Sequence, residues 1–171
     1  QLDAPGVAEL TGAGSYYGAA LTEAASYRGE HMVVVGGANS AGQGAMFFSR
    51  YASKVTILVR SSSLSKSMSQ YLIDQIAGTE NIEVLPYHQV VEAYGQNRLE
   101  AISVLNSQTD EVVRMATPAM FLFIGAVPHS NYVAGVVATN SAGFILTGPD
   151  LLVDGKRPKG WKPQRDPFLL E

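Results

Sequence analysis

The chain has 171 residues, of which 46% are hydrophobic and 16% charged, a composition ordinary for a globular domain with its own core. Its formal net charge of −3 argues against nucleic-acid binding, because proteins of that class usually present a basic face. The absence of cysteine excludes disulfides, Cys-based zinc sites and thiol chemistry within these residues. We find neither a signal peptide nor an apolar run of roughly 18 residues, so we expect a cytoplasmic protein without membrane contact.

The first sixty residues predict a strand–helix–strand unit that follows a loop. Residues 1–30 begin with irregular, glycine-rich sequence and then adopt helical spacing over 20–28. A continuous apolar run, Val33–Val35, predicts a strand buried on both faces, which is typical of a parallel sheet. Alanine and phenylalanine recur at helical spacing over 40–52, and a second β-branched strand covers 54–60.

In the middle of the chain, alternating helices and strands give way to short strands alone. Residues 63–78 predict an amphipathic helix that starts at a Ser65 or Ser67 cap and ends near Gly78. A third strand comes next, over 81–86. Short strands separated by turn residues then predict an antiparallel meander and a last buried strand, over 88–95, 98–107, 111–116 and 119–128.

This order of elements predicts an α/β fold: a Rossmann-like, three-layer nucleotide-binding domain with a parallel sheet and a three-stranded antiparallel β-meander. We expect the domain itself over 31–130, after a connecting segment and first helix over 1–30. Prolines and basic residues accumulate near the end, so we expect an extended arm over 131–171. Because the sequence opens with Gln1 and stops directly after an apolar stretch, we expect it to belong to a longer protein.

The turn after the first buried strand has the spacing of a dinucleotide-binding fingerprint, Gly-x-Gly-x-x-Gly/Ala. Gly36, Ala38 and Ala41 occupy its three positions, so the middle glycine is an alanine. The first glycine makes the tight turn, and free N–H groups at the start of the helix, around Asn39 to Gly42, hold phosphate oxygens. The alternative is an ordinary strand–turn–helix connection built from small residues.

The end of the second strand favours NADP over NAD. NAD-binding versions of the fold usually carry an acidic residue about 20 residues after the turn. Here the strand ends in Arg60, followed by three serines and Lys66. A guanidinium, hydroxyls and an ammonium group suit the 2′-phosphate of NADP. The alternative is a solvated strand end with one exposed arginine.

The stretches "VVVGGANSAGQGAMFFSRYASKVTILVR" and "MFLFIGAVPHS" together resemble the NADPH-binding domain of thioredoxin-reductase-like flavoproteins, in the pyridine nucleotide-disulfide oxidoreductase family. The resemblance covers roughly 10–148. The family's turn, Gly-Gly-Gly-Asp/Asn-Ser/Thr-Ala, is matched over 36–41 except at Ala38. Its second strand ends in His-Arg-Arg, of which this chain keeps only Arg60, and Lys66 stands in for a more distant arginine.

A late family motif, Ile-Gly-x-x-Pro-Asn, is matched from Ile124 to Pro128, with His129 in place of asparagine. In the family this loop lies beside the adenosine side of the cofactor. His31, His88 and His129 do not have the spacing of metal ligands, so we expect no metal site, and we expect no catalytic residue in this chain. The resemblance implies that NADPH is bound by Gly36, Gly37, Ala38, Asn39, Ser40, Ala41, Gln43, Val59, Arg60, Ser61, Ser62, Lys66, Ile124, Gly125 and Ala126.

One departure concerns the redox disulfide. Thioredoxin reductases carry Cys-x-x-Cys-Asp before the first strand of this domain, whereas the corresponding residues 15–25 contain no cysteine. Thiol–disulfide exchange needs an attacking thiolate and is therefore excluded there. The resemblance is to a cysteine-free branch, as in ferredoxin-NADP reductases of this architecture. Tyr16 and Tyr17 stand in this region, and we expect them to have a packing role; the alternative is that they face a flavin in the intact protein.

The resemblance also implies what this chain works with. The family's FAD domain is built from segments before and after the NADPH domain, so FAD is expected to bind to another part of the same polypeptide. We expect an NADP(H)-binding module that supplies hydride to that flavin and is inactive alone, in a homodimeric oxidoreductase with an unknown electron acceptor. The alternative is a non-catalytic nucleotide-binding or regulatory module of the same fold.

Overall fold

The computed structural model describes residues 2–18 and 21–171, and the chain divides into two compact units. The first unit ends at Ile124, and the second extends from Gly125 to Glu171. No helix among the described residues is long and apolar enough to span a lipid bilayer.

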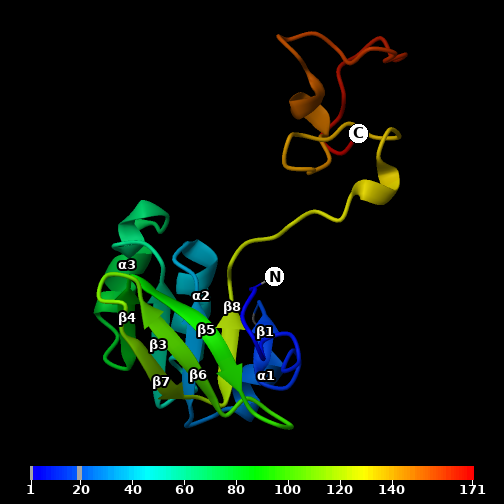
Figure 1. Ribbon diagram of the computed structural model, residues 1–171. Coiled ribbons are helices and arrows are strands. Elements are labelled where there is room, and N and C mark those ends of the chain that lie inside the picture. The colour runs from blue at the N-terminus through cyan, green and yellow to red at the C-terminus, as the bar shows by residue number, and fades with distance from the viewer. Residues whose placement is uncertain (1, 19–20) are drawn as a thin grey trace. The chain divides into compact units, whose positions relative to one another are not determined.

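The first unit is organised around a parallel sheet of five strands in the order β1-β8-β2-β3-β4 (Figure 1). All four pairings in this sheet are parallel. The strands are β1 (Ser15–Tyr17), β2 (His31–Val35), β3 (Lys54–Val59), β4 (Ile82–Pro86) and β8 (Ala119–Leu122).

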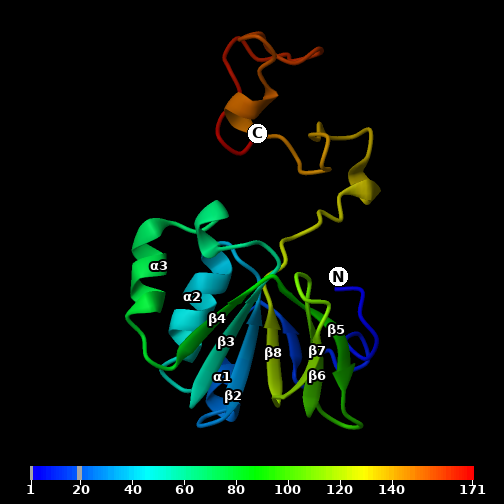
Figure 2. The ribbon, with the colours of Figure 1, turned by 60° about the vertical axis from the view of Figure 1, so that its left-hand side comes forward.

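Helices cover one face of this sheet and a second sheet covers the other, which gives three layers (Figure 2). On the helical side lie α2 (Asn39–Phe48) and α3 (Gln70–Ala77). On the other side lies an antiparallel meander in the order β5-β6-β7. Its strands are β5 (His88–Tyr94), β6 (Ala101–Asn106) and β7 (Val112–Ala116), and a short helix α1 (Leu21–Ser26) precedes β2. The predicted Rossmann-like fold with a β-meander is confirmed.

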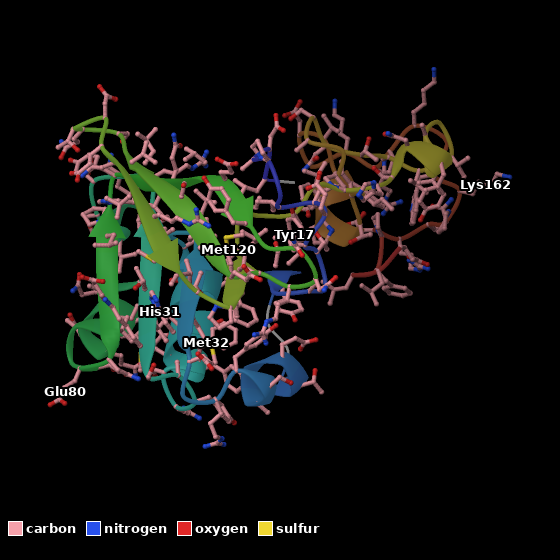
Figure 3. All side chains as sticks on the ribbon, turned by 60° about the horizontal axis from the view of Figure 1, so that its bottom comes forward. Tyr17, His31, Met32, Glu80, Met120 and Lys162 are labelled. Carbon is pink, nitrogen blue, oxygen red and sulfur yellow. The ribbon has the colours of Figure 1, made fainter. Side chains whose placement is uncertain are left out.

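Alternate residues of the central strands serve two separate hydrophobic cores, as the period of two in a strand requires. Met32 and Val34 of β2 belong to the core shared with α2 and α3. Val33 of β2 and Met120 of β8 belong to the core shared with the meander. Figure 3 labels one residue of each core, Met32 and Met120. The continuous apolar run in β2 exists because both of its faces are covered.

The predicted helix over 63–78 is wrong in one respect, because the structure divides it. A 3-10 helix η1 (Leu64–Lys66) is followed by a break and then by α3. Ser67 leaves helical geometry at φ −149°, and Ser69 is extended at φ −67° and ψ 143°. Serine favours such breaks because its hydroxyl competes for backbone partners. The N-cap of α3 is thus Ser69 and not one of the two serines that the sequence suggested, whereas Gly78 does form the C-cap.

Three other boundaries differ from expectation. The glycine-rich stretch contains strand β1, which pairs with β8. The last buried strand ends at Leu122 instead of extending to 128. Of the helix expected over 20–28, α1 covers Leu21–Ser26, and residue 20 lies outside the described residues. A strand of three residues between glycines has too little periodicity for a sequence pattern to reveal it.

The second unit has little regular structure. It contains two short 3-10 helices, η2 (Asn131–Val133) and η3 (Gly148–Leu151), and isolated bridges between single residue pairs. Near its end, the Arg165 guanidinium forms an ion pair with Glu171 and lies over the ring of Phe168. The hydrogen bonds from Arg165 lower the pKa of the Glu171 carboxyl to about 2.

Candidate functional site

The candidate site lies where the carboxyl ends of β2, β3 and β8 meet at one edge of the parallel sheet. The chain runs from β2 outward through β3 to β4 and later returns to the other side of β2 as β8. Parallel sheets of this kind bind ligands at such a reversal of strand order, outside the carboxyl ends of the strands. Within the first unit, the predicted site residues lie at the end of β3 and in the segments that follow β2, β3 and β8, including the first half of α2.

Gly36 closes the turn after β2 with a backbone conformation that requires glycine. Its φ is +144°, and a Cβ placed on it would lie 2.6 Å from the carbonyl oxygen of Phe123. Its N–H donates to Leu58 O at 3.1 Å, and the N–H of Phe123 donates to Val35 O at 2.8 Å. The turn is therefore held against the exits of both neighbouring strands.

Ala38 occupies the position where the common fingerprint has glycine, and it does so without strain. Its φ of −98° and ψ of 176° are extended values open to any residue. Its side chain is exposed. The alanine therefore leaves the backbone path of the turn intact and adds only one methyl group at its surface.

The start of α2 offers free backbone donors. Ala38 is the N-cap residue, and no side chain caps the helix. After Gly36, the next backbone amide with an acceptor among the described residues is that of Ala41, which donates to Ala38 O at 3.0 Å. Amides at a helix start, together with the helix dipole, suit an anion such as a phosphate group. Of the other residues predicted for this part of the site, Ser40 and Gln43 are exposed and Ala41 is buried.

A basic segment, defined as residues 60–66, leaves the carboxyl end of β3 beside this turn. Val59, the last residue of β3, is buried, and a Cβ on Gly37 would lie 2.9 Å from its Cγ1 atom. Arg60 and Lys66 are exposed, and neither takes part in an ion pair within the described parts of the chain. Ser61 is half-buried and Ser62 is exposed. The segment thus presents two cations that have no acidic partner in this part of the molecule.

Hydrogen bonds join the residues just after the basic segment to the glycine turn. The Ser67 hydroxyl donates to Gly37 O at 2.9 Å. The Ser69 N–H donates to the Asn39 side-chain oxygen at 2.8 Å, and the Ser69 hydroxyl donates to the same oxygen at 3.1 Å. The sequence did not identify Ser67 and Ser69 as partners of the turn, because its pattern predicted one continuous helix over 63–78 that contains both residues.

The remaining predicted site residues come after β8. Ile124 is the last residue of the first unit, and 37% of its surface is exposed. Gly125, which has φ +92°, and Ala126 open the second unit, and both are exposed. Phe123 was not among the predicted residues, although its carbonyl oxygen excludes a side chain at Gly36. No local sequence pattern marks a residue whose role is played by its backbone.

Tyr16 and Tyr17 lie in the stretch 15–25 where the resemblance places the cysteine pair, and residues 19 and 20 of that stretch lie outside the described residues. Tyr16 stacks on Phe121, with ring centroids 5.4 Å apart, and its hydroxyl lies 2.9 Å from that of Tyr27. Burial and this hydrogen bond raise the pKa of Tyr27 above its ordinary value. Tyr17, labelled in Figure 3, is 44% exposed, and its hydroxyl accepts a hydrogen bond from Leu2 N. Tyr16 is therefore packed against the sheet as expected, whereas Tyr17 is largely at the surface.

His31 lies at the opposite end of β2 and takes a structural position. One ring nitrogen lies 3.1 Å from Ala116 O and the other 2.9 Å from the Thr56 hydroxyl. Burial lowers the pKa of His31 below its ordinary value of 6.5. In the described residues, no group of three or more His, Cys, Asp or Glu side chains is arranged to hold a metal ion.

Comparisons with known proteins place the chain in a family and identify relatives. The family model described as pyridine nucleotide-disulphide oxidoreductase matches residues 1–154. The thioredoxin reductase of Dictyostelium discoideum is 35% identical over 125 residues, which are 72% of this chain and 38% of that protein. The mitochondrial thioredoxin reductase of Kluyveromyces lactis is 36% identical over 124 residues, which are 72% of this chain and 35% of that protein.

A solved structure of the thioredoxin reductase of Lactococcus lactis, in its FR conformation, superposes with a TM-score of 0.78 at 25% sequence identity. The superposition covers 87% of this chain and 48% of that one. The chain therefore spans less than half the length of these relatives.

Proposed function

Because this chain belongs to the pyridine nucleotide-disulphide oxidoreductase family, we propose that it is the NADP(H)-binding module of an FAD-dependent, thioredoxin-reductase-like oxidoreductase. The observation that carries the proposal is the pairing of the glycine turn with the basic segment at one edge of the sheet. The turn offers free amides to a pyrophosphate, and the basic segment offers Arg60 and Lys66 to a 2′-phosphate.

Different residues bind the pyrophosphate and the adenosine end of the cofactor. Gly36 makes the tight turn that brings the start of α2 to the pyrophosphate, and the amides of 38–40 bind its oxygens. Arg60, Lys66 and the Ser62 hydroxyl bind the adenosine end, whereas the Ser61 hydroxyl donates to Ser63 O within the segment. When bound, NADPH supplies a hydride, and the residues of this chain hold and orient it. FAD is bound by another part of the same polypeptide, within a homodimer located in the cytoplasm.

The electron acceptor is proposed to be something other than a disulfide on this chain. A disulfide reductase of this family needs a redox pair of thiols, and these 171 residues contain no cysteine. Binding and orientation of the nucleotide require no thiol, so the proposed role survives the loss.

A second candidate function is nucleotide binding without turnover, in a regulatory module of the same fold. The observation that favours it is the combined loss of the cysteines and of the middle glycine, replaced by Ala38. The two functions differ in the intact protein. Reduction of a dye by NADPH through bound flavin supports the first, and tight nucleotide binding without any dye reduction supports the second.

Calorimetric titration of the chain with NADPH and NADH tests the proposed cofactor. A hydrogen bond to a charged group contributes about 1.5–3 kcal/mol, so we expect NADPH to bind roughly tenfold or more tightly than NADH. The variant Arg60→Ala should lose most of this difference and keep its affinity for NADH. The matched control Arg50→Ala removes an exposed arginine beyond the far end of α2 and should change neither affinity. Equal affinity of the unchanged chain for both nucleotides would contradict the proposal.

A further inference from the structure

We infer that Asn39, Ser67 and Ser69 are positioning residues, which together fix the basic segment beside the glycine turn before any nucleotide binds. We call their three hydrogen bonds the clamp. None of the three side chains needs to touch the 2′-phosphate, because they act through Arg60 and Lys66. The inference rests on the proposed function and deepens it, since it names what sets the preference for a 2′-phosphorylated dinucleotide.

The clamp joins two parts of the chain that are about thirty residues apart. Ser67 donates to the carbonyl oxygen of Gly37, and both donors of Ser69 converge on the side-chain oxygen of Asn39, a sequence separation of 30 residues in each case. Gly37 lies in the turn and Asn39 is the first residue of α2. The clamp therefore connects directly to the two features proposed to hold the pyrophosphate.

Apolar anchors hold the same segment from beneath. Leu64 and Met68 are each 6% exposed and belong to the core on the helical face. A Cβ added to Gly42 of α2 would lie 2.8 Å from the terminal methyl group of Met68. Close packing on α2 leaves the segment little freedom to shift, and it brings Ser67 and Ser69 to the turn.

Bonds within the basic segment set its own shape. The Ser61 hydroxyl donates to Ser63 O at 2.8 Å, and the hydroxyls of Ser63 and Ser65 lie 2.8 Å apart. At its start, Tyr87 N donates to Ser61 O at 3.1 Å. The backbone that carries Arg60 and Lys66 is thus fixed at its beginning by Tyr87 and at its end by the clamp.

Because the segment is fixed in advance, it loses less conformational entropy when a nucleotide binds. Without the clamp, part of the ordering of Arg60 and Lys66 would occur at the moment of binding and would weaken it. The 2′-phosphate of NADP⁺ binds to Arg60 and Lys66, whereas NAD⁺ has no 2′-phosphate and is bound mainly by the turn. The clamp should therefore matter for NADP⁺ much more than for NAD⁺.

The test measures NADP⁺ and NAD⁺ affinity by calorimetry in Ser67→Ala, Ser69→Ala and the double variant of the 171-residue chain. We expect NADP⁺ affinity to fall about threefold in each single variant and about tenfold in the double variant, with NAD⁺ affinity unchanged. The matched control is Ser53→Ala, an exposed serine just before the start of β3, at the end of that strand away from the site. It should leave both affinities as they are. Amide hydrogen exchange over 61–69 in the free clamp variants should become faster.

A double-mutant cycle separates positioning from a general structural role. In an Arg60→Ala background, the clamp variants should have little further effect on NADP⁺ affinity, because the main group they position is gone. Equal losses for NADP⁺ and NAD⁺, unchanged affinities, or full additivity with Arg60→Ala would each overturn the inference. Those outcomes leave the proposed function standing. If the unchanged chain binds both nucleotides equally, the proposed cofactor preference itself fails.

Discussion

At the scale of single residues, the path of the turn after β2 depends on the backbone conformation of one glycine. Gly36 is required because of its φ of +144° and the carbonyl oxygen of Phe123. A fingerprint reveals such a glycine from sequence, and its position at the end of β2 was predictable. The hydrogen-bonding partners of Asn39 could not be predicted, because they lie 30 residues away at Ser69. The assignment of these residues to a cofactor stays a prediction.

The variant Gly36→Ala should be destabilised and should bind nucleotide poorly. A Cβ at this position meets Phe123 O at 2.6 Å and forces an alanine into backbone geometry that L-residues avoid, at a cost of about 1–3 kcal/mol. Urea denaturation measures the change in the free energy of unfolding. The control is Gly12→Ala, where φ is +84° but nothing lies within 4 Å of an added Cβ. A loss no larger than in the control would show that the close approach is unimportant.

His31 should make the stability of the chain depend on pH. Burial disfavours its protonated form, so the folded state has the lower pKa and the unfolded state takes up more protons as the pH falls below 6.5. The free energy of unfolding should therefore fall between about pH 7.5 and pH 5.5 and should not change above that window on account of His31. Lys54 acts in the same direction as burial, whereas the hydrogen bond to Ala116 O and the carboxylate of Glu83 oppose it.

The measurement compares urea midpoints at the two pH values in the unchanged chain and in His31→Gln. The variant lacks the titrating ring, so its midpoint should drop less on acidification. The control His129→Gln changes an exposed histidine and should behave like the unchanged chain. Identical drops in all three proteins would exclude His31 as the source of the pH dependence.

At the scale of elements, sequence patterns predicted those helices and strands whose pattern of apolar residues extends over several positions. The parallel strands and the meander were predictable, because mostly apolar strands of five and six residues and clusters of turn residues mark them. The single helix expected over 63–78 was wrong, because the break before α3 is stabilised by the distant bond between Ser69 and Asn39. Local propensity contains no information about that partner.

Phe48 joins α2 to the sheet, and its removal should cost much stability. Its side chain is fully buried, and its ring stacks on that of Phe121 with centroids 3.9 Å apart. Truncating a buried phenylalanine costs about 3–5 kcal/mol, so Phe48→Ala should lower the free energy of unfolding by this amount. The neighbouring Phe47 is only half-buried, and Phe47→Ala should cost clearly less. Similar costs for the two variants would contradict the role given to α2.

At the scale of the whole molecule, the proposed function predicts different behaviour for this chain and for the intact protein. The chain alone should purify without colour and should not reduce ferricyanide with NADPH, because the proposed flavin site lies in another part of the polypeptide. The intact protein should be yellow and should reduce ferricyanide. A flavin absorption band in the isolated chain would contradict the proposed division of labour. The control is the intact protein with Arg60→Ala, which should need a higher NADPH concentration to reach half of its maximal rate.

The location of the two hydrophobic cores has a consequence for the evolution of such a protein. Among the described residues, the side chains of both cores, including those packed at the margins, come from the unit that ends at Ile124. A recombination event that joined new sequence after that residue would leave no half-filled interior behind. Selection could then keep this unit and exchange the sequence after it, so gene fusion is a short step for this architecture.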